Sequence, residues 1–266
     1  MSEIVILFDE YGVPTFKSNR PSDWFLGVSV LYRLKDENSI MTACDQSFGL
    51  SNTKVRKNDR IGRETARNMA ESLQTTPIQI CIININLNNK QFIDTTNLYN
   101  EIGNKYRIRI RRVRSRSISQ VIHDEVMDDC ILESIRIHNE NKGIDNYIYL
   151  PHIDNWSFPN ADVEISLSTR SFSMADKINS IFTHFGFDNK ITIKPINLLD
   201  VDSKRKRFID GVTCIISRAY FDNSHIRYTK EPLDCLVANL ENNIQILDTT
   251  DRLIEFFQKF INRYGV

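Results

Sequence analysis

The chain has 266 residues, of which 41% are hydrophobic and 26% are charged, so it can bury a sizeable core. Its formal net charge is zero, which excludes a globally basic nucleic-acid-binding protein and leaves only local basic signals. Five cysteines without a CxxC pair argue against a disulfide framework or a zinc knuckle and indicate a reducing compartment. The sequence shows neither a signal-peptide pattern nor a membrane-spanning apolar window, so we expect a cytoplasmic protein.

Hydrophobic patterns predict strands along much of the chain. The short, wholly apolar run at 4–8 predicts a strand that is covered on both faces. Two strand-like segments, 24–34 and 39–48, flank a polar turn and predict a hairpin. Later apolar runs predict three more strands, at 78–85, 146–153 and 190–197.

Apolar residues at helical spacing predict the remaining elements, and the longest helix covers 118–138. The other predicted helices cover 63–73, about 95–104, 174–187, 207–221 and 249–264. Early strands joined by tight turns indicate antiparallel pairing, whereas later strand–helix alternation requires parallel crossovers. We therefore predict an α/β protein in which a mixed β-sheet has helices on both faces. No repeat or flexible linker divides the chain, so we predict a single domain over 1–266 with a C-terminal helical extension at about 222–266.

Acidic residues occur at three edges of predicted buried structure. Asp9 and Glu10 directly follow the first apolar run, and Asp154 directly follows the strand 146–153. Asp210 lies in an apolar helical pattern, where a carboxylate is costly to bury without a partner. Because consecutive side chains of a strand point to opposite faces, we expect Asp9 to face a shared site while Glu10 faces elsewhere.

Each acid also has an ordinary structural explanation. Aspartate at a strand end is common in turns. Asp210 fits the N-terminus of a helix, where it would cap free amides and meet the helix dipole. The prediction of a shared site therefore rests on the three acids occurring together, since a divalent cation suits converging carboxylates.

The start of the chain, IVILFDEYGVP…WFLGVSVLY, resembles the opening of a mostly prokaryotic family catalogued as domain of unknown function 3800 (DUF3800). That family begins with a strand ending in Asp-Glu-Ser-Gly, and Tyr11 stands here in place of the serine. Asp202-Ser203 and the following RFIDGV resemble the family's Asp-Ser and apolar helix with a central aspartate, although Arg-Phe-Ile replaces its Gln-Leu-Ala. NYIYLPHID resembles its middle strand. The matches follow one another in order over residues 4–222.

The resemblance implies a ribonuclease H-like fold and a divalent-metal-dependent nuclease that hydrolyses DNA or RNA. The metal ligands would be Asp9, Asp154 and Asp210, with Glu10 as a fourth ligand or a supporting group. In such a site carboxylates hold two cations about 3.5–4 Å apart, and Mg²⁺ or Mn²⁺ suits these oxygen ligands. The resemblance also implies an effector in a prokaryotic defence or mobile-element system, held by a partner protein.

The densest run of like charge is YRIRIRRVRSRS at 106–117. Its first arginines alternate with isoleucines, so on a strand they would form one basic face. Such clusters suit phosphate backbones, which they neutralise through bidentate contacts and counterion release. We predict that these arginines and two cations of the polar loop 51–62 contact nucleic acid: Lys54, Arg56, Arg107, Arg109, Arg111, Arg112, Arg114 and Arg116. The alternatives are a surface segment paired with acids elsewhere and a surface for a protein partner.

The segment HDEVMDD at 123–129 contains metal-ligand residue types on the predicted long helix. Because neighbouring apolar residues supply the buried face of that helix, we expect the acids of this segment to line its solvent side. His152, two residues before Asp154, is expected to be a structural hydrogen-bonding group. Serine-hydrolase and P-loop motifs are absent.

Two functional hypotheses follow. The first is a metal-dependent nuclease, which requires Asp9, Asp154 and Asp210 to converge. The alternative is a non-catalytic ribonuclease H-like module that binds nucleic acid or a partner protein through its arginine-rich segment.

Overall fold

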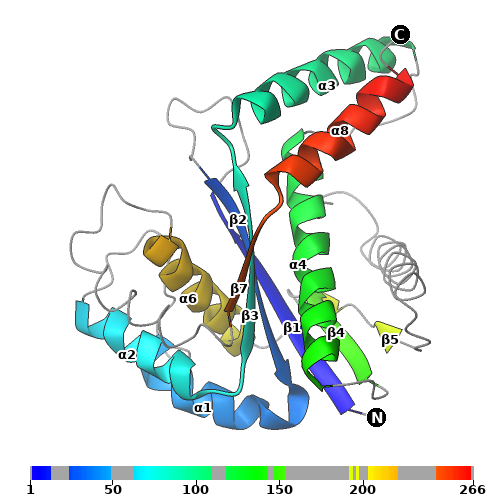
Figure 1. Cartoon of the computed structure of the whole chain (residues 1–266). Helices are drawn as coiled ribbons and strands as arrows, with labels where there is room; N and C mark the ends of the chain where they lie inside the picture. Colours follow the sequence, from blue (N-terminus) through cyan, green and yellow to red (C-terminus); the bar gives the residue numbers. More distant parts are fainter. Residues whose placement is uncertain are drawn as a thin grey trace.

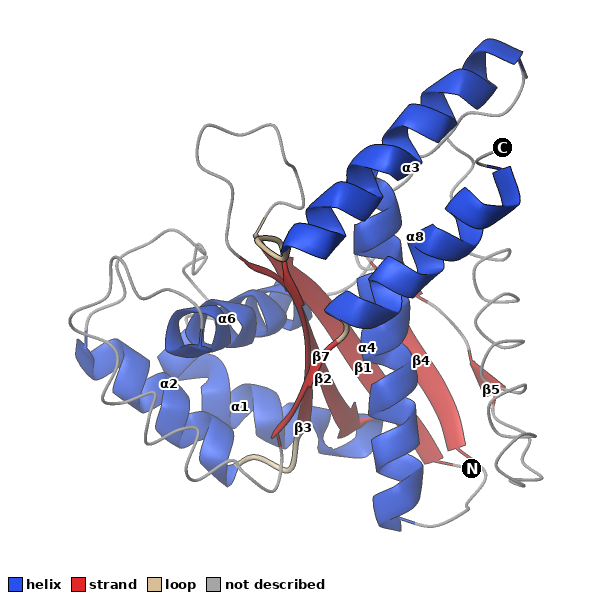
Figure 2. Ribbon diagram, turned by 45° about the horizontal axis from the view of Figure 1, so that its top comes forward, coloured by secondary structure: helices blue, strands red, loops and turns tan. Residues whose placement is uncertain are grey.

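The computed structural model describes nine ranges of the chain. These ranges are 2–12, 24–48, 63–109, 118–142, 147–153, 192–193, 196–197, 203–220 and 244–264. Within them, helices cover both faces of a mixed β-sheet (Figure 1), and the second view shows the same layers (Figure 2). The predicted α/β class with a mixed sheet is confirmed.

The described strands form one sheet in the order β5-β4-β1-β2-β3-β7, and β6 also pairs with β4. Their bounds are β1 Ser2–Tyr11, β2 Trp24–Arg33, β3 Gln79–Asn86, β4 Tyr147–Ile153, β5 Thr192–Ile193, β6 Ile196–Asn197 and β7 Ile244–Asp248. β2 runs antiparallel to β1 and β3, whereas β4 runs parallel to β1 and β7 runs parallel to β3. The carboxyl ends of β1, β3, β4 and β7 therefore lie at the same end of the sheet.

The described helices lie on both sides of this sheet. Their bounds are α1 Glu37–Phe48, α2 Arg63–Thr75, α3 Lys90–Arg109, α4 Ile118–Lys142, α6 Ser203–Tyr220 and α8 Thr250–Tyr264, and a 3-10 turn, Leu34–Asp36, precedes α1. α4 packs across β1, β2 and β3, whereas α6 packs on β1 and β2 together with α1 and α2. α3 and α8 pack against each other and project beyond the end of the sheet (Figures 1 and 2). Among the described residues, no helix has both the length and the apolar character that a bilayer crossing requires.

Strand β1 separates two apolar clusters. Ile4, Ile6 and Phe8 belong to the cluster under α4, whereas Val5 and Leu7 belong to the cluster under α1, α2 and α6. This alternation follows from the two-residue period of a strand, and it confirms the prediction that 4–8 is covered on both faces. We call these sides the α4 face and the α6 face.

Close packing on the α4 face depends on a glycine. A Cβ atom on Gly27 of β2 would lie 2.5 Å from Cγ1 of Val126 and 2.8 Å from Sγ of Cys130. Helix α4 therefore approaches β2 more closely than any side chain at position 27 would permit.

The predicted hairpin partner at 39–48 is wrong, because these residues form helix α1. Ile40, Met41 and Cys44 are buried at helical spacing against the α6 face. The described part of the arginine run is helical, since α3 continues to Arg109, so the basic face considered for a strand does not form there. β7 was not predicted, because its short half-exposed sequence carries a weak strand pattern. The predicted helix 174–187 lies outside the described residues.

Candidate carboxylate site

Asp9 and Glu10 lie inside β1 rather than after it. β1 continues to Tyr11, and Asp9 and Glu10 pair with Val28 and Gly27 of β2. Asp9 therefore has the same orientation as Leu7 and faces α6, whereas Glu10 faces α4. The strand thus directs two adjacent carboxylates to opposite sides of the sheet.

On the α4 face, Glu10 meets a buried histidine. Oε2 of Glu10 lies 3.6 Å from Nε2 of His123, and Nδ1 of the same ring lies 3.5 Å from Oδ1 of Asp124. Phe8 and Phe25 flank the imidazole with ring centroids 6.0 and 6.5 Å away. The ring therefore lies between two carboxylates and beside two phenylalanine rings on the α4 face.

These two carboxylates decide the charge of His123. Burial acts to lower the pKa of His123, but the carboxylates of Asp124 and Glu10 beside its ring outweigh burial and raise the pKa to about 9. The imidazole is therefore protonated at neutral pH and links β1 to α4 as a cation between two anions. A protonated ring has no lone pair for a metal ion.

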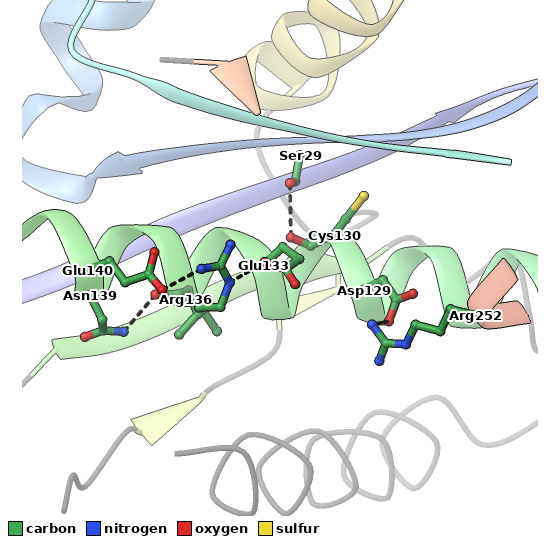
Figure 3. Close-up of polar contacts among 9 residues, drawn as sticks. Ser29, Asp129, Cys130, Glu133, Arg136, Asn139, Glu140 and Arg252 are labelled. Atoms are coloured by element: carbon green, nitrogen blue, oxygen red, sulfur yellow. Dashed lines mark hydrogen bonds and ion pairs between the residues drawn. The ribbon is translucent and has the colours of Figure 1, made fainter. Parts of the chain in front are cut away.

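The expectation that the acids of 123–129 line the solvent side of the long helix is wrong. Asp124, Asp128 and Asp129 are all buried. For two of them the physical reason is a nearby cation. Nδ1 of His123 lies 3.5 Å from Oδ1 of Asp124, and Nη1 of Arg252 on α8 lies 3.0 Å from Oδ1 of Asp129 (Figure 3). Helix α4 therefore buries polar as well as apolar side chains.

The same helix meets β2 through a polar contact in the core. Oγ of Ser29 lies 2.7 Å from Oγ of Ser134. It also lies 3.3 Å from the carbonyl oxygen of Cys130 (Figure 3). Farther along α4, Glu133 and Arg136 form an ion pair on its surface (Figure 3).

On the α6 face lie the other two described carboxylates of the prediction. Oδ2 of Asp9 is shielded from solvent. Asp210 is 9% exposed and lies two turns inside α6, which begins at Ser203, next to the fully buried Phe208 and Ile209. The explanation of Asp210 as a helix N-terminal cap is therefore excluded. Since α6 packs on β1, Asp9 and Asp210 belong to one layer of the molecule.

A buried histidine also lies in this layer. His152 of β4 is opposite Leu7 of β1; Nδ1 of His152 lies 2.9 Å from the carbonyl oxygen of Leu150, and its Nε2 lies 2.8 Å from Nη1 of Arg205. Burial and the positive charge of Arg205 lower the pKa of His152 to about 4, so this ring is neutral. These contacts agree with the structural role expected for His152.

Several predicted residues lie outside the described residues: Asp154, Lys54, Arg56, Arg111, Arg112, Arg114 and Arg116. Arg107 and Arg109 lie in the last turn of α3. Within the described ranges, no three His, Cys, Asp or Glu side chains form a group that could hold a metal ion. Asp9 on β1 and Asp210 on α6, which packs on β1, supply carboxylate oxygens, the ligand chemistry that Mg²⁺ and Mn²⁺ prefer.

Sequence reasoning missed His123 as the partner of Glu10, and it missed Arg205 and Glu37, which meet at α6. Their partners come from elements far apart in the sequence, so no local motif marks them. No family model matches the chain, and no curated protein matches it.

Proposed function

We propose that the protein is a divalent-metal-dependent nuclease with a ribonuclease H-like fold, in which Asp9, Asp154 and Asp210 hold Mg²⁺ or Mn²⁺. The observation that carries the proposal is the sorting of the acids by β1: Asp9 faces α6, and α6 carries Asp210 as a buried carboxylate. When bound, the cations would activate water and stabilise the leaving oxygen of a phosphodiester.

The register of the central strands supports Asp154 as the third ligand. β1 and β4 are parallel neighbours, and Leu7 lies opposite His152. In the sequence, Asp9 and Asp154 each follow those residues by two positions. Parallel strands bring their carboxyl ends to one edge of a sheet, where binding residues of α/β proteins commonly lie.

Glu10 has a different role in the proposal. Its carboxylate contacts the protonated His123 on the opposite face, so we assign it to holding the end of β1 against α4 rather than to the metal ions. The Glu10 contact would then also fix the position and orientation of Asp9, the preceding residue, on the α6 face.

The test is incubation of the protein with labelled DNA and RNA in Mg²⁺, in Mn²⁺ and in chelator. Wild type should cleave only with metal, and Asp9→Asn or Asp210→Asn should lower the rate more than about 100-fold, equivalent to about 2.7 kcal/mol of transition-state stabilisation. Asp248→Asn, on the edge strand β7, is the matched control and should keep the wild-type rate.

Metal-dependent cleavage that survives in the Asp9→Asn and Asp210→Asn variants would contradict the assignment. Nucleic-acid binding without cleavage by wild type would instead support the non-catalytic module. In that case the arginine run, whose first members end α3 in the projecting α3–α8 pair, would carry the binding.

A further inference from the structure

Arg205 connects three elements of the α6 face through one guanidinium group. Its Nε lies 3.0 Å from both carboxylate oxygens of Glu37, and its Nη2 lies 2.6 Å from Oε2 of Glu37. Its Nη1 contacts Nε2 of His152 at 2.8 Å. Arg205 belongs to the first turn of α6, Glu37 is the first residue of α1 and His152 lies near the carboxyl end of β4.

The contact with His152 has a fixed direction. Arginine has only donors, so Nε2 of His152 accepts the hydrogen bond. The other ring nitrogen, Nδ1, must then carry the hydrogen, which it donates to the carbonyl oxygen of Leu150. Both nitrogens of the buried ring are therefore used, and the ring cannot rotate without losing both bonds.

The contact with Glu37 is a fork-shaped pair in partly buried surroundings. The side chains of Arg205 and Glu37 are 18% and 20% exposed, and Tyr32 of β2 directs its hydroxyl to Oε2 of Glu37 at 3.4 Å. Fork-shaped pairs of this kind are stronger and more directional than contacts to a lysine ammonium. Arg205 is thus held in one geometry from both sides.

This group lies between the elements that carry the candidate ligands. Asp210 follows Arg205 by five residues in the same helix, about 7.5 Å along the helix axis. His152 lies opposite Leu7, and Asp9 is the next residue of β1 on that face. A rotation or shift of α6 over β1 would change the separation of Asp9 and Asp210.

We propose that Arg205 is a positioning residue of the carboxylate site: by joining α6 to β4 and α1, it fixes the helix that carries Asp210 relative to the strands of the site. This inference rests on the proposed function. Arg205 does not act on the substrate; it acts through the placement of Asp210.

The experiment compares Arg205→Gln, Arg205→Lys, His152→Gln and His152→Leu with wild type. The readouts are Mn²⁺ affinity by calorimetry, kcat and KM for labelled nucleic acid, and hydrogen exchange of backbone amides. Arg136→Gln is the matched control, because Arg136 also pairs with carboxylates but lies on α4 at the opposite face.

We expect Arg205→Gln to speed exchange of the α6 amides, to weaken Mn²⁺ binding about tenfold, or about 1.4 kcal/mol, and to lower kcat while KM is unchanged. Arg205→Lys should restore the slow exchange of the α6 amides but only part of kcat, since lysine cannot form the fork-shaped pair with Glu37. His152→Gln keeps an acceptor and should resemble wild type, whereas His152→Leu should resemble Arg205→Gln. Arg136→Gln should change none of these values.

Three results would overturn the inference. If wild type is active and Arg205→Gln keeps its kcat and Mn²⁺ affinity, Arg205 does not position the site, and the proposed function stands. If exchange of α6 is unchanged in Arg205→Gln, Arg205 does not hold the helix at all. If wild type neither binds Mn²⁺ nor cleaves, the proposed function fails and the positioning role fails with it, while the exchange data still decide whether Arg205 holds α6.

Discussion

The α4 face buries His123 and the α6 face buries His152, and the surroundings hold these two rings in opposite charge states. On the α4 face, His123 is 2% exposed between Glu10 and Asp124, and its pKa is raised to about 9. On the α6 face, His152 is 0% exposed beside Arg205, and its pKa is lowered to about 4. At neutral pH the first ring is a cation and the second is neutral.

Burial cannot explain this difference, because it disfavours the charged form of both rings. The sign of the nearest charge decides it: two carboxylates stabilise the imidazolium of His123, whereas a guanidinium opposes protonation of His152. On the α4 face His123 is an ionic link, and on the α6 face His152 is a neutral hydrogen-bonding group.

The largest effect is expected from removing the cation of the α4 face. His123→Leu should lower the free energy of unfolding by about 3–5 kcal/mol, because Asp124 and Glu10 would keep negative charges without their partner. Urea denaturation at pH 7 measures it. The double variant His123→Leu with Asp124→Asn should recover part of the loss, and a single-variant loss under about 1 kcal/mol would show that the ring is not the charged partner.

The two histidines should destabilise the protein at opposite ends of the pH range. The folded-state pKa of His123 is above its unfolded value, so its stabilisation is complete below about pH 6.5 and is lost as the pH rises through 9. The folded-state pKa of His152 is below its unfolded value, so its contribution is present above about pH 6.5 and is lost as the pH falls through 4. The loss of stability at high pH (the alkaline limb) and the loss at low pH (the acid limb) each amount to about 3 kcal/mol.

Thermal or urea unfolding between pH 4 and pH 10 measures both limbs. His123→Gln should flatten the alkaline limb alone, and His152→Gln should flatten part of the acid limb alone. A variant that flattens the limb assigned to the other histidine would reverse the assignment of charge states.

A smaller effect is expected from the close approach of α4 to β2. Gly27→Ala should lower the free energy of unfolding by about 1–3 kcal/mol, because the new methyl group would overlap Val126 and Cys130. Gly103→Ala is the matched control, since nothing lies within 4 Å of its Cβ position on α3, and alanine should stabilise that helix by up to about 1 kcal/mol. Equal effects of the two changes in urea denaturation would refute the close packing.

The smallest effect is expected at the outer edge of the α4 face. Arg252→Gln removes the ion pair with Asp129, but the Arg252 side chain is 58% exposed, so the loss should stay below about 1 kcal/mol. The loss should shrink in 1 M salt, because screening weakens exposed pairs. A salt-independent loss of several kcal/mol would show that the Arg252–Asp129 pair behaves as a buried ion pair.

Sequence patterns predicted the elements whose apolar residues recur with one clear period. The runs that became β1, β3 and β4 and the long pattern that became α4 were identified with boundaries shifted by a few residues. The short apolar run at 39–48 fits both the strand period and the helix period, so the sequence predicts a strand there. Only the burial of this segment against the α6 face shows that it is a helix. For the candidate site, alternation correctly separated Asp9 from Glu10, while the shared role of Asp9, Asp154 and Asp210 stays a prediction.

The sequence by itself determined the α/β class, the double-sided burial of β1 and the opposite directions of Asp9 and Glu10, because these depend on residues adjacent along the chain. Only the tertiary structure decided which charge meets each buried group. His123 meets Glu10, and Arg205 meets Glu37 and His152, across distant parts of the chain. The protonation of a buried ring depends on the nearest charge in space, and that neighbour is set by how helices pack on the sheet rather than by sequence spacing.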